Sequence, residues 1–125
     1  MRLTVAGRPL TQPLILKMDP RIKTPPEGLR AQFDRSMEVG ADMARTLDAL
    51  HATKAEHAKV TTGARAKGLA DRESKLTDLN GKLTALYTSL QEVDAAPTAA
   101  MVDAAAELRR QVSQALESAQ RPPAR

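Results

Sequence analysis

The chain has 125 residues, a mass of 13.5 kDa and no cysteine, so it forms one domain at most and has no disulfide framework or thiolate chemistry. Hydrophobic residues make up 42% of it, but it holds one Phe, one Tyr and no Trp, so its core must be built from Leu, Ala, Val and Met, as in a helical bundle. The net charge of +4 lies entirely within the first 30 residues, where the basic side chains are scattered rather than gathered on one helix face, and this disfavours nucleic-acid binding.

Residues 1–18 show the two-residue alternation of a β-hairpin. Leu3 and Val5 alternate with polar neighbours, Ala6-Gly7 stands where a tight turn belongs, and Leu14 and Leu16 alternate along the predicted second strand. Prolines in this part of the chain remove ladder donors and confine that strand to an edge. An isolated hairpin is marginal in water because its edges and apolar face stay unburied. The residues that we predict to bind a partner are therefore Leu3, Val5, Leu14 and Leu16.

Residues 19–28 form a predicted linker. Pro20, Pro25 and Pro26 bias the residues before them toward extended conformations. We expect a semi-rigid connector rather than a flexible one.

From Leu29 onward the apolar spacing changes to the 4-3 alternation of helices that pack along a seam. We predict helices over residues 29–61, 70–93 and 98–120, followed by a disordered tail at 121–125. Asp71 and Thr98 are the predicted N-caps of the second and third helices. The predicted core residues are Leu29, Phe33, Ser36, Gly40, Met43, Leu47 and Leu50 in the first helix, Leu69, Leu76, Leu79, Leu83, Leu86, Leu90 and Val93 in the second, and Met101, Ala105, Leu108, Val112, Ala115 and Ala119 in the third.

Short connections between three helices predict an antiparallel up-down-up bundle. The predicted fold class is therefore mainly α: a short N-terminal β-hairpin followed by an antiparallel three-helix bundle. No apolar stretch approaches the 18 or so residues of a membrane span, so we expect no membrane insertion. The N-terminus carries charge and proline where a signal peptide has its apolar region, so we expect no export signal within this chain.

The sequence offers little chemistry. His51 and His57 are six residues apart and do not match the i,i+4 spacing of helical metal ligands, so we expect both to be solvent-exposed. Asp34, Glu38 and Asp42 form an acidic ridge, which we interpret as a solvated face beside several arginines. We predict no catalytic residue, no cofactor and no metal site.

The first third of the chain resembles the C-terminal region of large bacterial sortilin-like, BNR/Asp-box β-propeller proteins, which are often labelled glycosyl hydrolases. The residues that carry the resemblance are Arg2-Leu3-Thr4-Val5, Gly7, Thr11-Gln12-Pro13-Leu14, Lys17-Met18-Asp19-Pro20-Arg21, Lys23-Thr24, Leu29 and Gln32-Phe33.

In that family this stretch is the last hairpin of an immunoglobulin-like β-domain, reached after the propeller, and it leads into a terminal helical segment. The resemblance implies that Met1 falls within a strand, that the chain is a fragment, and that the parent is exported to the periplasm or beyond the cell. No glycosidase residue is carried over, since the Asp-box requires a Trp and this chain has none. The compartment of this chain itself stays open.

Two functions follow as hypotheses. The first is a non-catalytic C-terminal structural or interaction module, whose hairpin docks on the rest of a parent β-domain or propeller. The alternative is a free-standing helical adaptor that forms oligomers with a second protomer, through its hairpin edges and its 4-3 helical stripes. The two differ in what covers the apolar side chains of residues 1–18.

Overall fold

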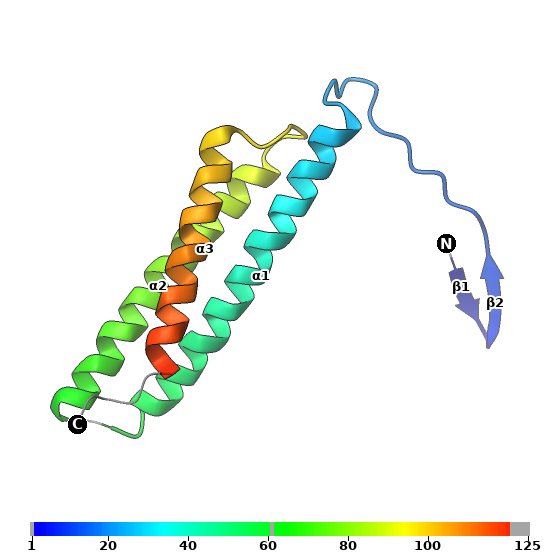
Figure 1. Cartoon of the computed structure of the whole chain (residues 1–125). Helices are drawn as coiled ribbons and strands as arrows, with labels where there is room; N and C mark the ends of the chain where they lie inside the picture. Colours follow the sequence, from blue (N-terminus) through cyan, green and yellow to red (C-terminus); the bar gives the residue numbers. More distant parts are fainter. Residues whose placement is uncertain (1, 61, 121–125) are drawn as a thin grey trace.

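The computed structural model describes residues 2–60 and 62–120, the side chains of residues 119 and 120 excepted. It contains a two-stranded antiparallel hairpin and three helices, which confirms the predicted mainly-α class. The three helices run side by side in alternating directions, and the hairpin stands apart from them at the end of an extended segment (Figure 1). The elements are β1 (Arg2–Val5), β2 (Arg8–Thr11), α1 (Pro26–His57), α2 (Gly63–Gln91) and α3 (Ala99–Gln120).

Each helix begins beside a proline, a glycine or a threonine. Pro25 is extended, with φ −66° and ψ 156°, and Pro26 occupies the first turn of α1, so this helix begins three residues before the predicted start. It ends at His57 rather than at residue 61, and Thr61 lies outside the described residues. The predicted tail at 121–125 is also outside them.

The prediction for the start of α2 was wrong. This helix begins at Gly63, whose φ of +88° marks the turn, and Asp71 lies well inside it instead of capping it. The residues between Gly63 and Asp71 are mostly Ala, Arg and Lys, which favour helix, so the helix extends back to Gly63. The predicted cap of α3 is confirmed, because the Thr98 hydroxyl accepts a hydrogen bond of 3.3 Å from the backbone N–H of Met101.

The centre of the bundle is built from the predicted stripes of α2 and α3. Leu76, Leu83 and Leu90 are 0%, 1% and 2% exposed, and they belong to one core cluster with the fully buried Val112 of α3. Ala105, Leu108 and Ala115 continue the core along α3 as predicted, whereas the Ala119 side chain lies outside the described part of the chain. Val93 is 62% exposed and does not belong to the core, because α2 ends two residues before it.

The α1 helix turns a different face to the core than its apolar spacing predicts. Ser36 and Leu50 are buried as expected, but Phe33 is 60% exposed and Leu47 is 36% exposed. The positions that face the core are largely polar or small, and they are Gly28, Gln32, Ser36, Val39, Asp42, Thr46, Leu50 and Thr53.

Polar contacts set this rotation. The Gln32 side chain donates hydrogen bonds of 2.5 and 2.7 Å to the carbonyls of Leu90 and Val93, where the end of α2 leaves backbone acceptors without helical partners. On the other side, Arg109 of α3 donates a hydrogen bond of 3.1 Å to Asp42, which is 4% exposed. Since buried polar groups are costly without partners, these bonds favour the observed orientation over one that buries Phe33.

Candidate functional site

The hairpin presents one apolar face. The two-residue turn Ala6-Gly7 has φ values of 47° and 78°, the left-handed geometry that twists two strands together. It sets the register Leu3↔Leu10 and Val5↔Arg8, so the two leucines and Val5 share one side of the sheet. Leu3, Val5 and Leu10 are 56%, 54% and 62% exposed.

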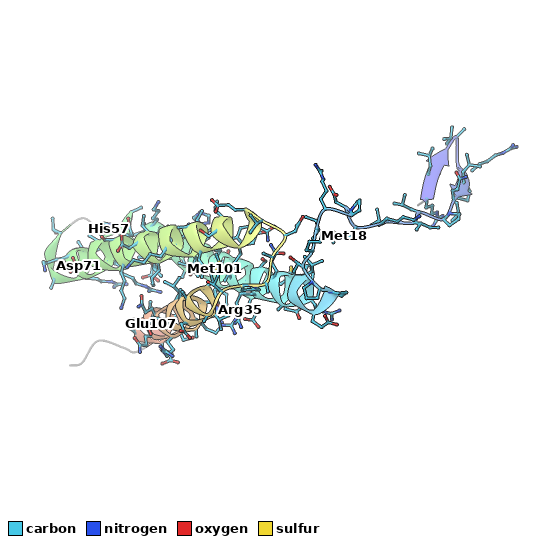
Figure 2. All side chains as sticks on the ribbon, turned by 90° about the horizontal axis from the view of Figure 1, so that it is seen from above. Met18, Arg35, His57, Asp71, Met101 and Glu107 are labelled. Carbon is cyan, nitrogen blue, oxygen red and sulfur yellow. The ribbon has the colours of Figure 1, made fainter. Side chains whose placement is uncertain are left out.

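Nothing in the described part of the chain covers that face. Every residue from 2 to 18 is exposed, and neither strand contacts a helix. Met18 lies on the extended segment that leads away from the bundle, with the hairpin beyond it (Figure 2). The two strands form the whole sheet, so the outer edge of each carries backbone N–H and C=O groups that no strand pairs. We call residues 2–18 the arm.

The second strand was predicted in the wrong place. It spans Arg8–Thr11, whereas Leu14 and Leu16 lie beyond it in extended chain and are 62% and 86% exposed. The reason is the register: the turn pairs Val5 with Arg8 and Arg2 with Thr11, so the pairing with β1 reaches neither Leu14 nor Leu16. Sequence reasoning also missed Leu10, although the two-residue turn predicts its pairing with Leu3 directly.

The linker is tied to the bundle over its second half. The Thr24 hydroxyl donates a hydrogen bond of 2.5 Å to the carbonyl of Asp94, in the connection between α2 and α3. Gly28 is buried beside it, and a Cβ at that position would stand 2.9 Å from a Thr24 methyl and 3.2 Å from the Ala96 side chain. The first turn of α1 therefore needs glycine to approach this connection closely.

The first half of the linker is a small turn held by an ion pair. The Arg21 guanidinium donates to both carboxylate oxygens of Asp19, with 2.7 Å between Nη2 and Oδ2, and the backbone N–H of Ile22 donates to the Asp19 carbonyl. These side-chain and backbone bonds from Arg21 lower the pKa of Asp19, and the carboxylate raises the pKa of Arg21. The arm therefore leaves the bundle from a defined turn.

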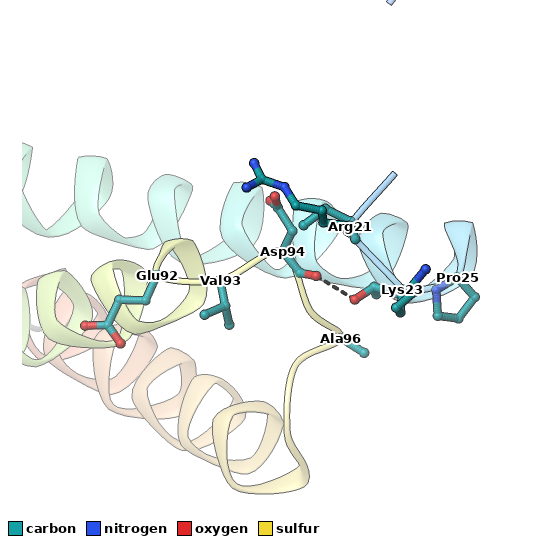
Figure 3. A pocket seen from close by; sticks show the side chains of 9 residues that line it. Arg21, Lys23, Pro25, Glu92, Val93, Asp94 and Ala96 are labelled. Carbon is teal, nitrogen blue, oxygen red and sulfur yellow. Dashed lines mark hydrogen bonds between the residues drawn. The ribbon is translucent and has the colours of Figure 1, made fainter. Parts of the chain in front are cut away.

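A shallow hollow lies between the linker and the α2–α3 connection (Figure 3). Two cations, Arg21 and Lys23, line it together with Glu92 and Asp94. The opposite charges balance one another, so the hollow has no excess charge that would select a ligand.

The acidic ridge is not the solvated face that we predicted. Asp34 is exposed and pairs with Arg30 at 3.5 Å, but Asp42 is buried and pairs with Arg109 of α3. Glu38 lies between them, 2.5 Å from Arg35 and 3.5 Å from Arg109. Glu38 and Asp42 link α1 to α3 through Arg109, whereas Asp34 pairs within α1. They are engaged with arginines and do not converge on a common point.

The two histidines differ in solvent exposure. His51 is exposed, as predicted, whereas His57 is only half exposed because its Nδ1 lies 2.7 Å from a carboxylate oxygen of Glu73 in α2. Among the described residues, no three His, Asp or Glu side chains are grouped so that they could hold a metal ion. In the same part of the chain, no helix combines the length and the apolar character that crossing a membrane requires.

Comparison with known proteins found no matching family model, no matching curated protein and no matching solved structure. The surface that the geometry singles out is therefore the arm, whose apolar face and strand edges are unpaired within the described chain.

Proposed function

We propose that this chain is a non-catalytic structural and interaction module. In this proposal the three-helix bundle is a folded support, and the arm docks on a strand edge of a larger β-domain. The observation that carries the proposal is the hairpin, which has an apolar face in water and no contact with the helices of its own chain. The resemblance of residues 1–33 to the end of sortilin-like BNR propeller proteins suggests which domain this is: the immunoglobulin-like domain that follows the propeller.

Burial of the hairpin face would supply much of the binding energy. Leu3, Val5 and Leu10 are each more than half exposed. Burying a side chain of this size from water contributes about 1.5–3 kcal/mol, so covering what remains exposed on these three would contribute about 3–5 kcal/mol. Added strand pairing would give the edge N–H and C=O groups partners and favour one register. A two-stranded hairpin that is marginal alone becomes stable as part of a sheet.

The register also indicates where the partner strand runs. Leu14 and Leu16 continue the line of β2 past the point where β1 supplies a neighbour. A strand of the β-domain that lies in line with β1 would pair with this stretch. It would cover Leu14 and Leu16 on the same sheet, since residues two apart face the same side.

Two observations favour an interaction role over a catalytic one. The three carboxylates that the sequence offered as an acid/base group are bound to arginines, and one of them is buried between helices. The large exposed apolar side chains gather on the arm and along one side of α1 instead. Exposed apolar surface of this extent is typical of a protein that binds another protein.

The test begins with the coding sequence directly upstream of Met1. The proposal requires an in-frame continuation that encodes further β-strands; a stop codon there, with no such strands, overturns it. The β-domain so encoded is expressed separately and mixed with this chain, and amide hydrogen exchange is measured at residues 2–16. We expect fast exchange in the chain alone and strong protection in the mixture.

A matched pair of variants tests the mode of binding. Leu3→Asp places a charge on the apolar face, whereas Thr4→Asp places the same charge on the opposite face of the same strand. We expect Leu3→Asp to abolish protection and Thr4→Asp to preserve it. Equal loss in both variants would contradict docking through the apolar face. Both should leave the melting temperature of the bundle unchanged, because the hairpin contacts no helix in the described chain.

A further inference from the structure

A second exposed surface lies along α1, on the side that faces away from the core. Phe33 and Met37 are each 60% exposed and Leu47 is 36% exposed, at the 4-3 spacing that aligns them on one helix face with Gly40 and Ala44 between them. We call these five residues the α1 face. Tyr87 of α2 borders it, since its ring lies 3.9 Å from the point where a Cβ on Gly40 would stand, and it is 37% exposed.

The composition of the α1 face is that of the centre of a protein interface. It carries no charge, although 27% of the chain is charged. Aromatic side chains and methionine are enriched at interface cores, and charges are depleted there. With about 200–250 Å² for a fully exposed side chain of this size, Phe33, Met37, Leu47 and Tyr87 expose roughly 400–500 Å² together. That is about half of the 800 Å² that each partner of a standard interface buries, before the flanking residues are included.

The α1 face is nearly symmetric about its middle. Phe33 stands seven positions before Gly40 and Leu47 seven positions after it, while Met37 stands three positions before it and Ala44 four positions after it. If a second α1 crosses in the opposite direction with a two-fold axis at Gly40, Phe33 of one copy lies over Leu47 of the other. Gly40 adds no side chain at the crossing point, where Tyr87 of the same chain lies beside it.

The charges beside the α1 face fit the same arrangement. Arg30 and Asp48 lie on one flank, 18 residues or five helical turns apart, and Asp34 and Arg45 lie on that flank 11 residues or about three turns apart. Along the helix the signs therefore alternate: positive, negative, positive, negative. Measured along the helix, Arg30 lies about 15 Å and Asp48 about 12 Å from the two-fold axis, on opposite sides of it. In the antiparallel crossing, Arg30 of one copy therefore lies beside Asp48 of the other. Asp34 of one copy lies beside Arg45 of the other in the same way. In a parallel pairing the two-fold axis runs along the helices, so the charged flank of one copy lies beside the opposite flank of the other and these charges do not meet.

We propose that the α1 face binds a second copy of this chain, with the two α1 helices antiparallel and the two-fold axis at Gly40. The two Tyr87 rings then meet near the axis and close the flank opposite the charges. The proposed contact uses residues of α1 and Tyr87, and no strand of the arm touches a helix in the described chain. Docking of the arm and pairing of α1 are therefore independent, and each can fail without the other.

The test uses the full chain in sedimentation-equilibrium and light-scattering measurements over a range of concentrations. We expect a dimer, and we expect Met37→Asp to be monomeric with an unchanged helical circular-dichroism signal, because this side chain is exposed. A chain that lacks residues 1–18 should still dimerise, since the linker and bundle contacts all lie after them. A monomeric full chain, or a dimer that Met37→Asp does not weaken, overturns the proposal.

Charge reversal tests the direction of the helices. Asp48→Arg should weaken the dimer at least tenfold, because it opposes Arg30 of the second copy, and the double variant Arg30→Asp with Asp48→Arg should restore the affinity to within about threefold. Asp103→Arg, at an exposed position of α3, makes the same change of charge and should have no effect. Failure of the double variant to recover would refute the antiparallel arrangement, and a dimer lost on removal of residues 1–18 would assign the contact to the arm.

Discussion

The ion pair between α1 and α3 should be a larger source of stability than the exposed pairs around it. The Asp42 side chain is only 6% exposed, and its Oδ2 lies 3.1 Å from Nε of Arg109, which is 46% exposed. Replacing Arg109 by Met keeps much of the aliphatic packing but removes the cation. Asp42 then keeps only Arg45, at 3.5 Å, as a charged partner.

The expected loss can be bounded from the geometry. Two unit charges about 4 Å apart attract by about 4 kcal/mol at the effective dielectric of a protein surface and by about 1 kcal/mol in bulk water. Because Asp42 is buried and Arg109 is half exposed, the pair lies between these limits. Arg45 compensates in part. We therefore expect Arg109→Met to lower the free energy of unfolding by about 1–3 kcal/mol.

Urea unfolding at pH 7, followed by far-ultraviolet circular dichroism, measures this loss. The matched control is Arg110→Met on the same helix, because Arg110 is 67% exposed and its partner Glu107 is 49% exposed. An exposed pair of this kind contributes about 0–1 kcal/mol. If Arg109→Met costs no more than Arg110→Met, the buried pair does not stabilise the bundle in the way described. Added salt should reduce the cost of the control more than that of Arg109→Met.

Three further predictions concern single positions. Gly81→Ala should raise the free energy of unfolding by about 0.5–1 kcal/mol in the same urea assay, because Gly81 is inside α2 with nothing within 4 Å of the added Cβ. Gly28→Ala should lower the free energy of unfolding, because its added Cβ would stand 2.9 Å from the Thr24 side chain of the linker. Thr46→Val should change the stability by less than about 1 kcal/mol, since the buried hydroxyl donates only to the carbonyl one turn earlier; a loss well above that would show another role for the hydroxyl. The side chains of Gln111 and Arg110 donate to Glu107 and lower its pKa, so the stabilisation is present above the pKa of the unfolded chain and is lost as the pH falls through the pKa of the folded chain. Gln111→Ala should raise the Glu107 pKa in an NMR titration, and an unmoved midpoint would contradict this assignment.

The candidate site was only partly predictable. Leu3 and Val5 were placed correctly on a strand, because a two-residue turn follows them directly in the sequence. Leu14 and Leu16 were predicted to lie in the second strand, which ends at Thr11, because alternation alone does not set register: the turn does, and it pairs Leu3 with Leu10. Three residues of the α1 face, Phe33, Gly40 and Leu47, were assigned to the core, because 4-3 spacing identifies an apolar stripe without saying which neighbour covers it.

The sequence by itself determined the local elements of this protein. Spacing and composition predicted three helices, the cap at Thr98 and most core positions of α2 and α3, Val93 excepted, because these depend on contacts a few residues apart or on a single strong stripe. Only the tertiary structure decided how α1 is rotated. Its orientation depends on partners far along the chain, Arg109 for Asp42 and the end of α2 for Gln32. Bonding these buried polar groups outweighs the burial of Phe33 and Met37, and leaves an apolar face in water.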